Sequence, residues 1–302
     1  MRLSVMVLGF VCLSAVVIGI AAPAIQDDGD VRGAFLTSRP KVKPANTGTT
    51  SKPSRRRPKA PGPTNPGKQP EKISTKPNTP PPSNPSQPAT PVNVARLGLG
   101  MTLFMRDSNG LAVRVDPEHV FQKGDRVRVL LETNSDGYLY IFNTTDNGPA
   151  TMIYPNADLD EAGNFLQAHV PFEIPNSAAT EERLRWFAFD EVAGTERLMF
   201  VFTREPLSGI PIEDDLIALC RDSKESCPVK PNEEMWAGVQ KEMQEPLKTD
   251  KAKQYGGTET STEQQATTRG LGLAKDDPQP SLVMMASSPR PRLIAALDLI
   301  HK

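Results

Sequence analysis

A long proline-rich stretch, from Pro40 to Pro91, sets the first limit on how this 302-residue chain can fold. It holds 15 of the chain's 30 prolines and 10 Lys/Arg, has no aromatic residue, and contains a single acidic residue, Glu71. Proline cannot donate a backbone hydrogen bond, and so few apolar side chains cannot offset the entropy of ordering the chain. We therefore expect residues 25–93 to form a disordered, basic linker that precedes the folded part.

The first 24 residues have the pattern of a secretory signal peptide. Met1-Arg2 is followed by an apolar run from Leu3 to Ile20 and by the small residues Ala21-Ala22-Pro23-Ala24. A charged start, an apolar run and an A-x-A site are the order found in such signals. We expect cleavage after Ala24 and export to the periplasm, the cell envelope or the extracellular space. An uncleaved anchor is the alternative, because the run approaches the about 20 residues of a spanning helix, and only then would the chain contact a membrane.

The charge of the chain is divided between its two parts. Residues 1–91 hold 13 Lys/Arg against 4 Asp/Glu, a net +9, and residues 92–302 hold 22 against 32, a net −10. Binding of nucleic acid needs a concentrated basic surface, so the acidic part is not expected to bind it. The basic linker is either simply solvated or in contact with anionic lipid or wall polymer.

Short apolar runs separated by turns begin at about Val94 and predict β-strands. Residues 125–132 alternate charged and apolar side chains, as a strand with one buried face does, and residues 138–142 are aromatic or branched throughout. Asn134-Ser135-Asp136-Gly137 supplies turn residues between them. Strands spaced in this way are typical of a sandwich or barrel rather than of alternating βαβ units.

The later part of the chain adds helices and a last pair of strands. We expect a mainly β fold, a small antiparallel sandwich or barrel-like domain over residues 94–203 that the C-terminal strands of 281–302 complete. Residues 204–248 read as a helical insert, with Asn232 as a cap for the second helix. Residues 249–280 are polar and contain Gly256-Gly257, which predicts a flexible loop.

Two cysteines remain after removal of the signal, and both lie in the helical insert. Cys220 and Cys227 would enter a compartment in which disulfides persist, so we expect them to pair. A thiol nucleophile is the alternative. Two cysteines and three scattered histidines do not supply the ligands of a zinc site, and no metal or other cofactor is predicted.

Four segments of the β region carry a family resemblance. They are Phe121-Gln122-Lys123-Gly124-Asp125-Arg126-Val127-Arg128-Val129, Asp136-Gly137-Tyr138-Leu139-Tyr140, Ile153-Tyr154-Pro155-Asn156 and Gly194-Thr195-Glu196-Arg197-Leu198. In this order and at these spacings they resemble an exported bacterial family called domain of unknown function 4384. The resemblance spans roughly Leu97 to Thr203, with the closing stretch from Leu282 to His301. It implies a small β domain that is often joined by linkers to other envelope or signalling modules, and it implies no catalytic residue.

Few residues of the sequence indicate a binding or catalytic role. Tyr138 and Tyr140 can line a binding groove or fill the core, and Asn156, Asp158 and Asp160 can bind calcium or form a solvated turn, since the glycine and glutamate of an EF-hand are missing. Gly98-Leu99-Gly100 lacks the third glycine of a dinucleotide loop and fits the start of a strand. The signature motifs of serine, zinc and penicillin-binding enzymes do not occur.

Binding is therefore the leading hypothesis for function. We expect an exported, non-catalytic binding or envelope-interaction module on a long basic tether, with a protein or a cell-envelope polymer as its partner. The alternative is an envelope hydrolase that acts on a wall polymer or glycan through paired carboxylates, because an acidic domain can gather such a pair. Two buried carboxylates in one pocket would favour the hydrolase.

Overall fold

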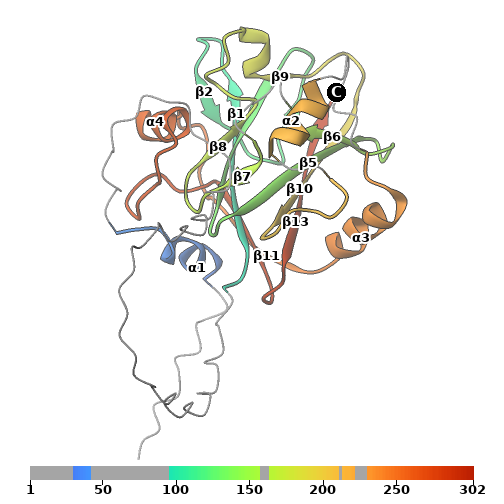
Figure 1. The fold of residues 1–302 in the computed structure, drawn as a ribbon. Coiled ribbons are helices and arrows are strands. Elements are labelled where there is room, and N and C mark those ends of the chain that lie inside the picture. The colour runs from blue at the N-terminus through green and yellow to red at the C-terminus, as the bar shows by residue number, and fades with distance from the viewer. Residues whose placement is uncertain (1–29, 42–94, 157–162, 211–212, 222–229) are drawn as a thin grey trace, which may run out of the picture. The chain divides into compact units, whose positions relative to one another are not determined.

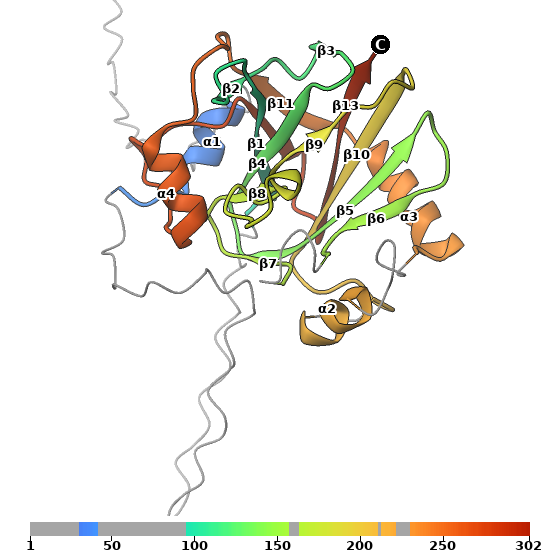
Figure 2. The same cartoon turned by 90° about the horizontal axis from the view of Figure 1, so that it is seen from above.

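Two β-sheets pack face to face in the computed structural model, which describes residues 30–41, 95–156, 163–210, 213–221 and 230–302 (Figures 1 and 2). Sheet A has the strand order β11-β12-β1-β4-β8, with β2 beside β1 and β9 beside β4. Its strands are β1 (Gly98–Arg106), β2 (Ala112–Arg114), β4 (Arg126–Thr133), β8 (Phe172–Ile174), β9 (Phe187–Ala188), β11 (Leu247–Lys251) and β12 (Leu282–Ala286).

Sheet B faces it with the order β3-β13-β10-β5-β6, and β7 lies beside β5. All the pairs are antiparallel except that of β13 with β3, which is parallel. Its strands are β3 (Val120–Phe121), β5 (Gly137–Thr145), β6 (Thr151–Tyr154), β7 (Phe165–Leu166), β10 (Gly194–Thr203) and β13 (Arg292–His301).

The core lies between the sheets and is built from alternate residues of each long strand. Val127, Val129 and Leu131 of β4 face Leu198, Phe200 and Phe202 of β10 across one apolar cluster. Successive side chains of a strand point to opposite faces, so the alternation in the sequence selects this face. The prediction of a mainly β, sandwich-like fold is confirmed.

Helices cover the outer faces of both sheets, α3 on sheet B and both α1 and α4 on sheet A (Figure 2). Asn232 caps α3 by accepting a hydrogen bond from the amide of Met235 at 2.7 Å. In the part of the chain that the structure describes, no helix is long and apolar enough to cross a membrane. The helices are α1 (Val31–Thr37), α2 (Glu213–Arg221), α3 (Glu233–Met243) and α4 (Ser261–Arg269), with the 3-10 turn η1 (Glu182–Arg185).

The expectation of a flexible loop over residues 249–280 is wrong. This segment contains the end of β11 and the whole of α4, which starts with a capping box between Thr260 and Glu263. Glu263 is also bonded to Arg114 of β2 at 2.5 Å, and the side chain of Leu273 is buried. The segment is ordered by polar contacts with the sheet rather than by an apolar stripe of its own, so its polarity was misleading.

The helix α1 corrects the predicted linker of residues 25–93, because it packs on sheet A. Phe35 is fully buried against Val283 and Met285 of β12. A side chain at Gly98 would bring its Cβ to 2.8 Å from the Phe35 ring, so glycine at this position of β1 leaves room for the helix. The Gly98-Leu99-Gly100 motif therefore has a packing role.

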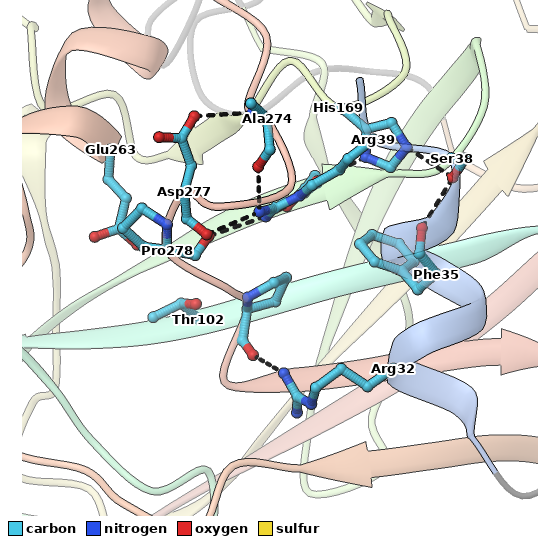
Figure 3. Close-up of polar contacts among 12 residues, drawn as sticks. Arg32, Phe35, Ser38, Arg39, Thr102, His169, Glu263, Ala274, Asp277 and Pro278 are labelled. Carbon is cyan, nitrogen blue, oxygen red and sulfur yellow. Dashed lines mark hydrogen bonds and ion pairs between the residues drawn. The ribbon is translucent and has the colours of Figure 1, made fainter. Parts of the chain in front are cut away.

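A buried ionic network, which we call the clasp, fixes the end of α1 (Figure 3). The Arg39 guanidinium donates to both carboxylate oxygens of Glu132 at 2.8 and 2.6 Å, and also to the carbonyls of Ala274, Asp277 and Pro278 at 3.0 to 3.1 Å. His169 contacts Glu132 at 2.7 Å. Burial alone would raise the pKa of Glu132, but the bonds from His169 and Arg39 outweigh it and hold that pKa below its ordinary value.

The position of α1 changes the role of the proline-rich stretch. Residue 41 ends a segment docked on sheet A, and Leu97 lies buried at the start of β1 in the same sheet. Residues 42–94 lie outside the described residues, but they join two fixed points of one domain. The stretch therefore cannot set the distance between this domain and whatever precedes residue 30.

We predict that the clasp contributes strongly to stability. The Arg39→Met variant should be destabilised by about 3–5 kcal/mol, because it leaves the Glu132 carboxylate buried without its main partner. The matched control is Lys41→Met at an exposed position two residues away. Its free energy of unfolding should be close to that of the wild type. Urea unfolding of the three proteins gives the comparison, and equal free energies of unfolding for the two variants would contradict the clasp.

Candidate functional site

Tyr138 and Tyr140, predicted as groove residues or core residues, lie in the interior. Both are fully buried on the outer face of sheet B, beneath the helical insert. The Tyr140 hydroxyl accepts a hydrogen bond from the amide of Leu207 at 3.3 Å, and burial raises its pKa. The groove hypothesis for these two side chains is therefore wrong, and they anchor the insert instead.

Most of the other predicted site residues lie outside the part of the chain that the structure describes. Asn156 is half-buried after β6, whereas Asp158 and Asp160 lie outside the described residues. Among the residues described, no cluster of His, Cys, Asp and Glu could hold a metal ion. Cys220 belongs to α2, but its side chain and the whole of Cys227 also lie outside the described residues, so the disulfide stays a prediction.

The clasp contains a serine, a histidine and a glutamate in the order of a hydrolase triad. The Ser38 hydroxyl lies 2.8 Å from His169 Nε2 (Figure 3). On the other side of the ring, His169 Nδ1 lies 2.7 Å from Glu132. Two features oppose catalysis. Ser38 follows the C-terminal end of α1, where carbonyl oxygens repel a developing oxyanion. The Glu132 charge is also already neutralised by Arg39. We interpret the triad order as part of the clasp.

A second group of charges lies on the outer face of sheet A. The Arg128 guanidinium stacks 4.4 Å from the centre of the Trp186 ring and contacts two carboxylates, Glu173 at 3.2 Å and Glu259. The Glu173 side chain is 1% exposed and that of Glu259 is 8% exposed. Glu259 lines a polar pocket of about 350 Å³. Burial and repulsion by Glu173 raise the pKa of Glu259 to about 8.

A further cavity, a cleft of about 280 Å³, opens between sheets A and B. Sheet A contributes Val127 of β4 and the short strand β9, and sheet B contributes residues of β5, β6, β10 and β13. We call this cavity the cleft. It is lined by Val127, Asn143, Ile153, Phe187, Ala188, Phe189, Asp190, Glu196, Leu198, Leu299 and His301.

Stacked rings shape one wall of the cleft. Phe189 stacks on Phe121 at 4.7 Å between ring centres, and His301 packs on Phe189 at 5.0 Å. His301 comes from the last residue of β13, which pairs with Phe121 of β3. The C-terminus of the chain and the first strand of sheet B therefore form this wall together.

Polar groups are few in the cleft and are mostly acceptors. Asn143 donates through Nδ2 to Glu196 at 2.8 Å, and the Thr145 hydroxyl donates to the same carboxylate at 3.0 Å. Asn143 Oδ1 and His301 Nδ1 are buried without a hydrogen-bond partner. A mostly apolar cleft with a few convergent polar groups is the usual form of a small-ligand site.

The sequence indicated only part of this site. Val127, Ile153, Glu196 and Leu198 all belong to the motifs that carry the family resemblance, but nothing in them indicated a cavity. Asn143, Asp190 and His301 were missed entirely. One available signal was the motif residue Glu196, a charged residue on the same face of its strand as the apolar Leu198 and Phe200.

The buried pair of Glu173 and Glu259 makes a testable prediction about pH. The folded protein holds a proton on Glu259 up to about pH 8, whereas the unfolded chain loses it near the ordinary value of about 4.3. The stability that this proton gives is complete below the unfolded pKa and is lost as pH rises through about 8. The melting temperature of Glu259→Gln minus that of the wild type should therefore increase from pH 5 to pH 9.

Glu191→Gln is the control for this series. Its carboxylate is 74% exposed and pairs only with exposed Lys123, so its melting temperature should follow that of the wild type at every pH. A difference between Glu259→Gln and the wild type that does not change with pH would contradict the shared-proton interpretation.

Most of the cleft residues lie in a segment that matches a known protein family. Residues 120–206 match the model of a family described as Domain of unknown function (DUF4384), and all the cleft residues except Leu299 and His301 lie in this segment. No curated protein and no solved structure matches the chain. The predicted resemblance is confirmed, and over residues 120–206 the chain is similar to this family of unknown function.

Proposed function

We propose that this chain is an exported binding module of the cell envelope and that the cleft is its ligand site. The observation that carries the proposal is a cavity of about 280 Å³ at the junction of two sheets that share one apolar core cluster. Its walls are mostly apolar side chains, and among the described residues two buried polar atoms that line it, Asn143 Oδ1 and His301 Nδ1, have no hydrogen-bond partner. Such a cavity suits a ligand with an apolar body and a few hydrogen-bond donors.

The signal-like sequence of the first 24 residues supports export and an envelope location for this module. The A-x-A site ends at Ala24, and α1 starts at Val31, so only residues 25–30 separate the signal from the folded domain. A mature chain would begin almost at the domain, and an uncleaved anchor would hold the domain near the membrane surface. The earlier hypothesis of a long tether is replaced by that of a basic loop carried by the domain.

The basic loop suits contact with an anionic envelope polymer. Its 10 Lys/Arg against one Glu lie between two points fixed on the domain. A dense positive charge of this kind attracts polyanions without a folded site. We assign the specific contact to the cleft and the non-specific contact to the loop.

The hydrolase alternative has one observation in its favour, the pair of Glu173 and Glu259 beside Arg128. Of this pair only Glu259 lines the polar pocket, since the Glu173 side chain is 1% exposed. The other carboxylate that lines the pocket, Glu182, is 58% exposed and paired with Arg106. A glycosidase needs both carboxylates at the scissile bond. The pair fits that requirement poorly, so hydrolysis remains the second candidate.

A cleft-filling variant tests the proposal. Immobilised mature protein should retain a component of its own envelope extract, and Ile153→Trp should lose it, because the larger ring fills the cavity beside the half-buried Ile153 side chain. The matched control is Val192→Trp at an exposed position outside the cleft, and it should retain the component like the wild type.

Two results would count against the binding proposal. Equal retention by Ile153→Trp and the wild type would place the contact outside the cleft. Release of soluble fragments from purified wall polymer by the wild type, abolished in Glu259→Gln, would favour the hydrolase instead.

A further inference from the structure

The Glu196 carboxylate of the cleft has no cationic partner among the described residues. Its three hydrogen bonds come from neutral donors, the side-chain amide of Asn143 and the hydroxyl of Thr145. Arg197, the next residue of β10, points to the other face of the sheet and forms a bidentate pair with Asp298 at 2.7 and 2.9 Å. The nearest basic residue in sequence is therefore already used elsewhere.

Other acceptors line the cleft with Glu196. Asp190 binds the amide of Val192 at 2.8 Å through Oδ1 and has no basic partner in the described part of the chain. Asn143 Oδ1 and His301 Nδ1 are buried without partners, and His301 is 4% exposed. Two carboxylates and a free amide oxygen can only accept hydrogen bonds, so a matching ligand must donate several.

The rest of the cleft suits a short aliphatic chain. Ile153, Leu198 and Leu299 line it together with the rings of Phe187 and Phe189. Methylene groups gain about 0.8 kcal/mol each when such walls remove them from water. A ligand with a long polar body, such as a glycan, would leave its hydroxyl groups against these side chains.

We propose that the cleft binds a primary ammonium group carried on an aliphatic chain, as in a lysine side chain of a peptide. This inference rests on the proposed binding function and names its ligand class. The methylene stem lies between the sheets along the apolar walls, and the three ammonium donors meet Glu196, Asn143 Oδ1 and Asp190. The peptide backbone stays outside the cleft, at the ends of β10 and β13.

The charge of the ligand separates this proposal from simple apolar binding. The probes are Nα-acetyl-lysine methylamide and Nα-acetyl-norleucine methylamide, which share an unbranched aliphatic side chain but differ in the ammonium group. We expect calorimetric titration of the mature wild-type protein to show binding of the lysine probe about tenfold or more tighter than that of the norleucine probe.

Two carboxylate variants complete the design. Glu196→Gln keeps the shape of the side chain and its contacts with Asn143 and Thr145. It should lower the affinity for the lysine probe about tenfold and leave the affinity for the norleucine probe unchanged. Glu191→Gln, an exposed position outside the cleft, should bind the lysine probe like the wild type. Circular dichroism melts of both variants check that each is folded.

The lysine could come from a partner or from the chain's own basic segment, and a further variant distinguishes these sources. Replacing the 10 Lys/Arg of residues 41–76 by Gln should leave the affinity for the lysine probe unchanged if the partner supplies the lysine. Tighter binding after this replacement would show that the chain's own segment competes for the cleft, which also supports the ligand class.

The remaining outcomes overturn the inference. Equal binding of the lysine and norleucine probes, or no effect of Glu196→Gln, would mean an apolar ligand, and the binding function would still stand through Ile153→Trp. Absence of lysine binding to both the wild type and the neutralised chain would reject the ammonium ligand outright. Loss of envelope retention tests the function, and loss of charge selectivity tests only its ligand.

Discussion

The pairing of the C-terminal hairpin with both sheets is the interaction on which the rest of the structure depends. β12 lies between β11 and β1 in sheet A, and β13 lies between β10 and β3 in sheet B. β12 supplies the surface on which Phe35 packs, and β13 supplies two residues of the cleft, Leu299 and His301. Both the N-terminal helix and the candidate site are therefore completed by the last residues of the chain.

Strands could be predicted because one local pattern, alternation, decides which face is buried, as in residues 125–132. The helix α1 could not, since seven residues with the single buried side chain Phe35 carry little local signal. Its stability comes from Arg39 and Glu132, which are 93 residues apart. The cleft was equally hidden, because Glu196 and His301 meet only after both sheets have formed. Contacts between residues that are far apart in the sequence produce no periodic pattern from which they could be predicted.

Three acidic residues of the domain are stabilised in three different ways, and of these the side chains of Glu132 and Glu259 are buried whereas Glu196 is half-buried. Bonds from His169 and Arg39 hold the pKa of Glu132 below its ordinary value, whereas burial and the neighbouring Glu173 raise the pKa of Glu259 to about 8. Glu196 has only neutral donors. A carboxylate that has neither a cation nor a shared proton is costly to hold at an apolar wall unless a ligand compensates it. This difference is what distinguishes the cleft from the two structural networks.

A crystal structure of the mature chain grown with Nα-acetyl-lysine methylamide is the most direct test of a cation-binding cleft. We expect the methylene stem of the probe between β10 and β9, with its ammonium nitrogen within hydrogen-bond distance of the Glu196 carboxylate. The contrary result would be a cleft filled by protein side chains, or a probe bound elsewhere with Glu196 still contacted only by Asn143 and Thr145.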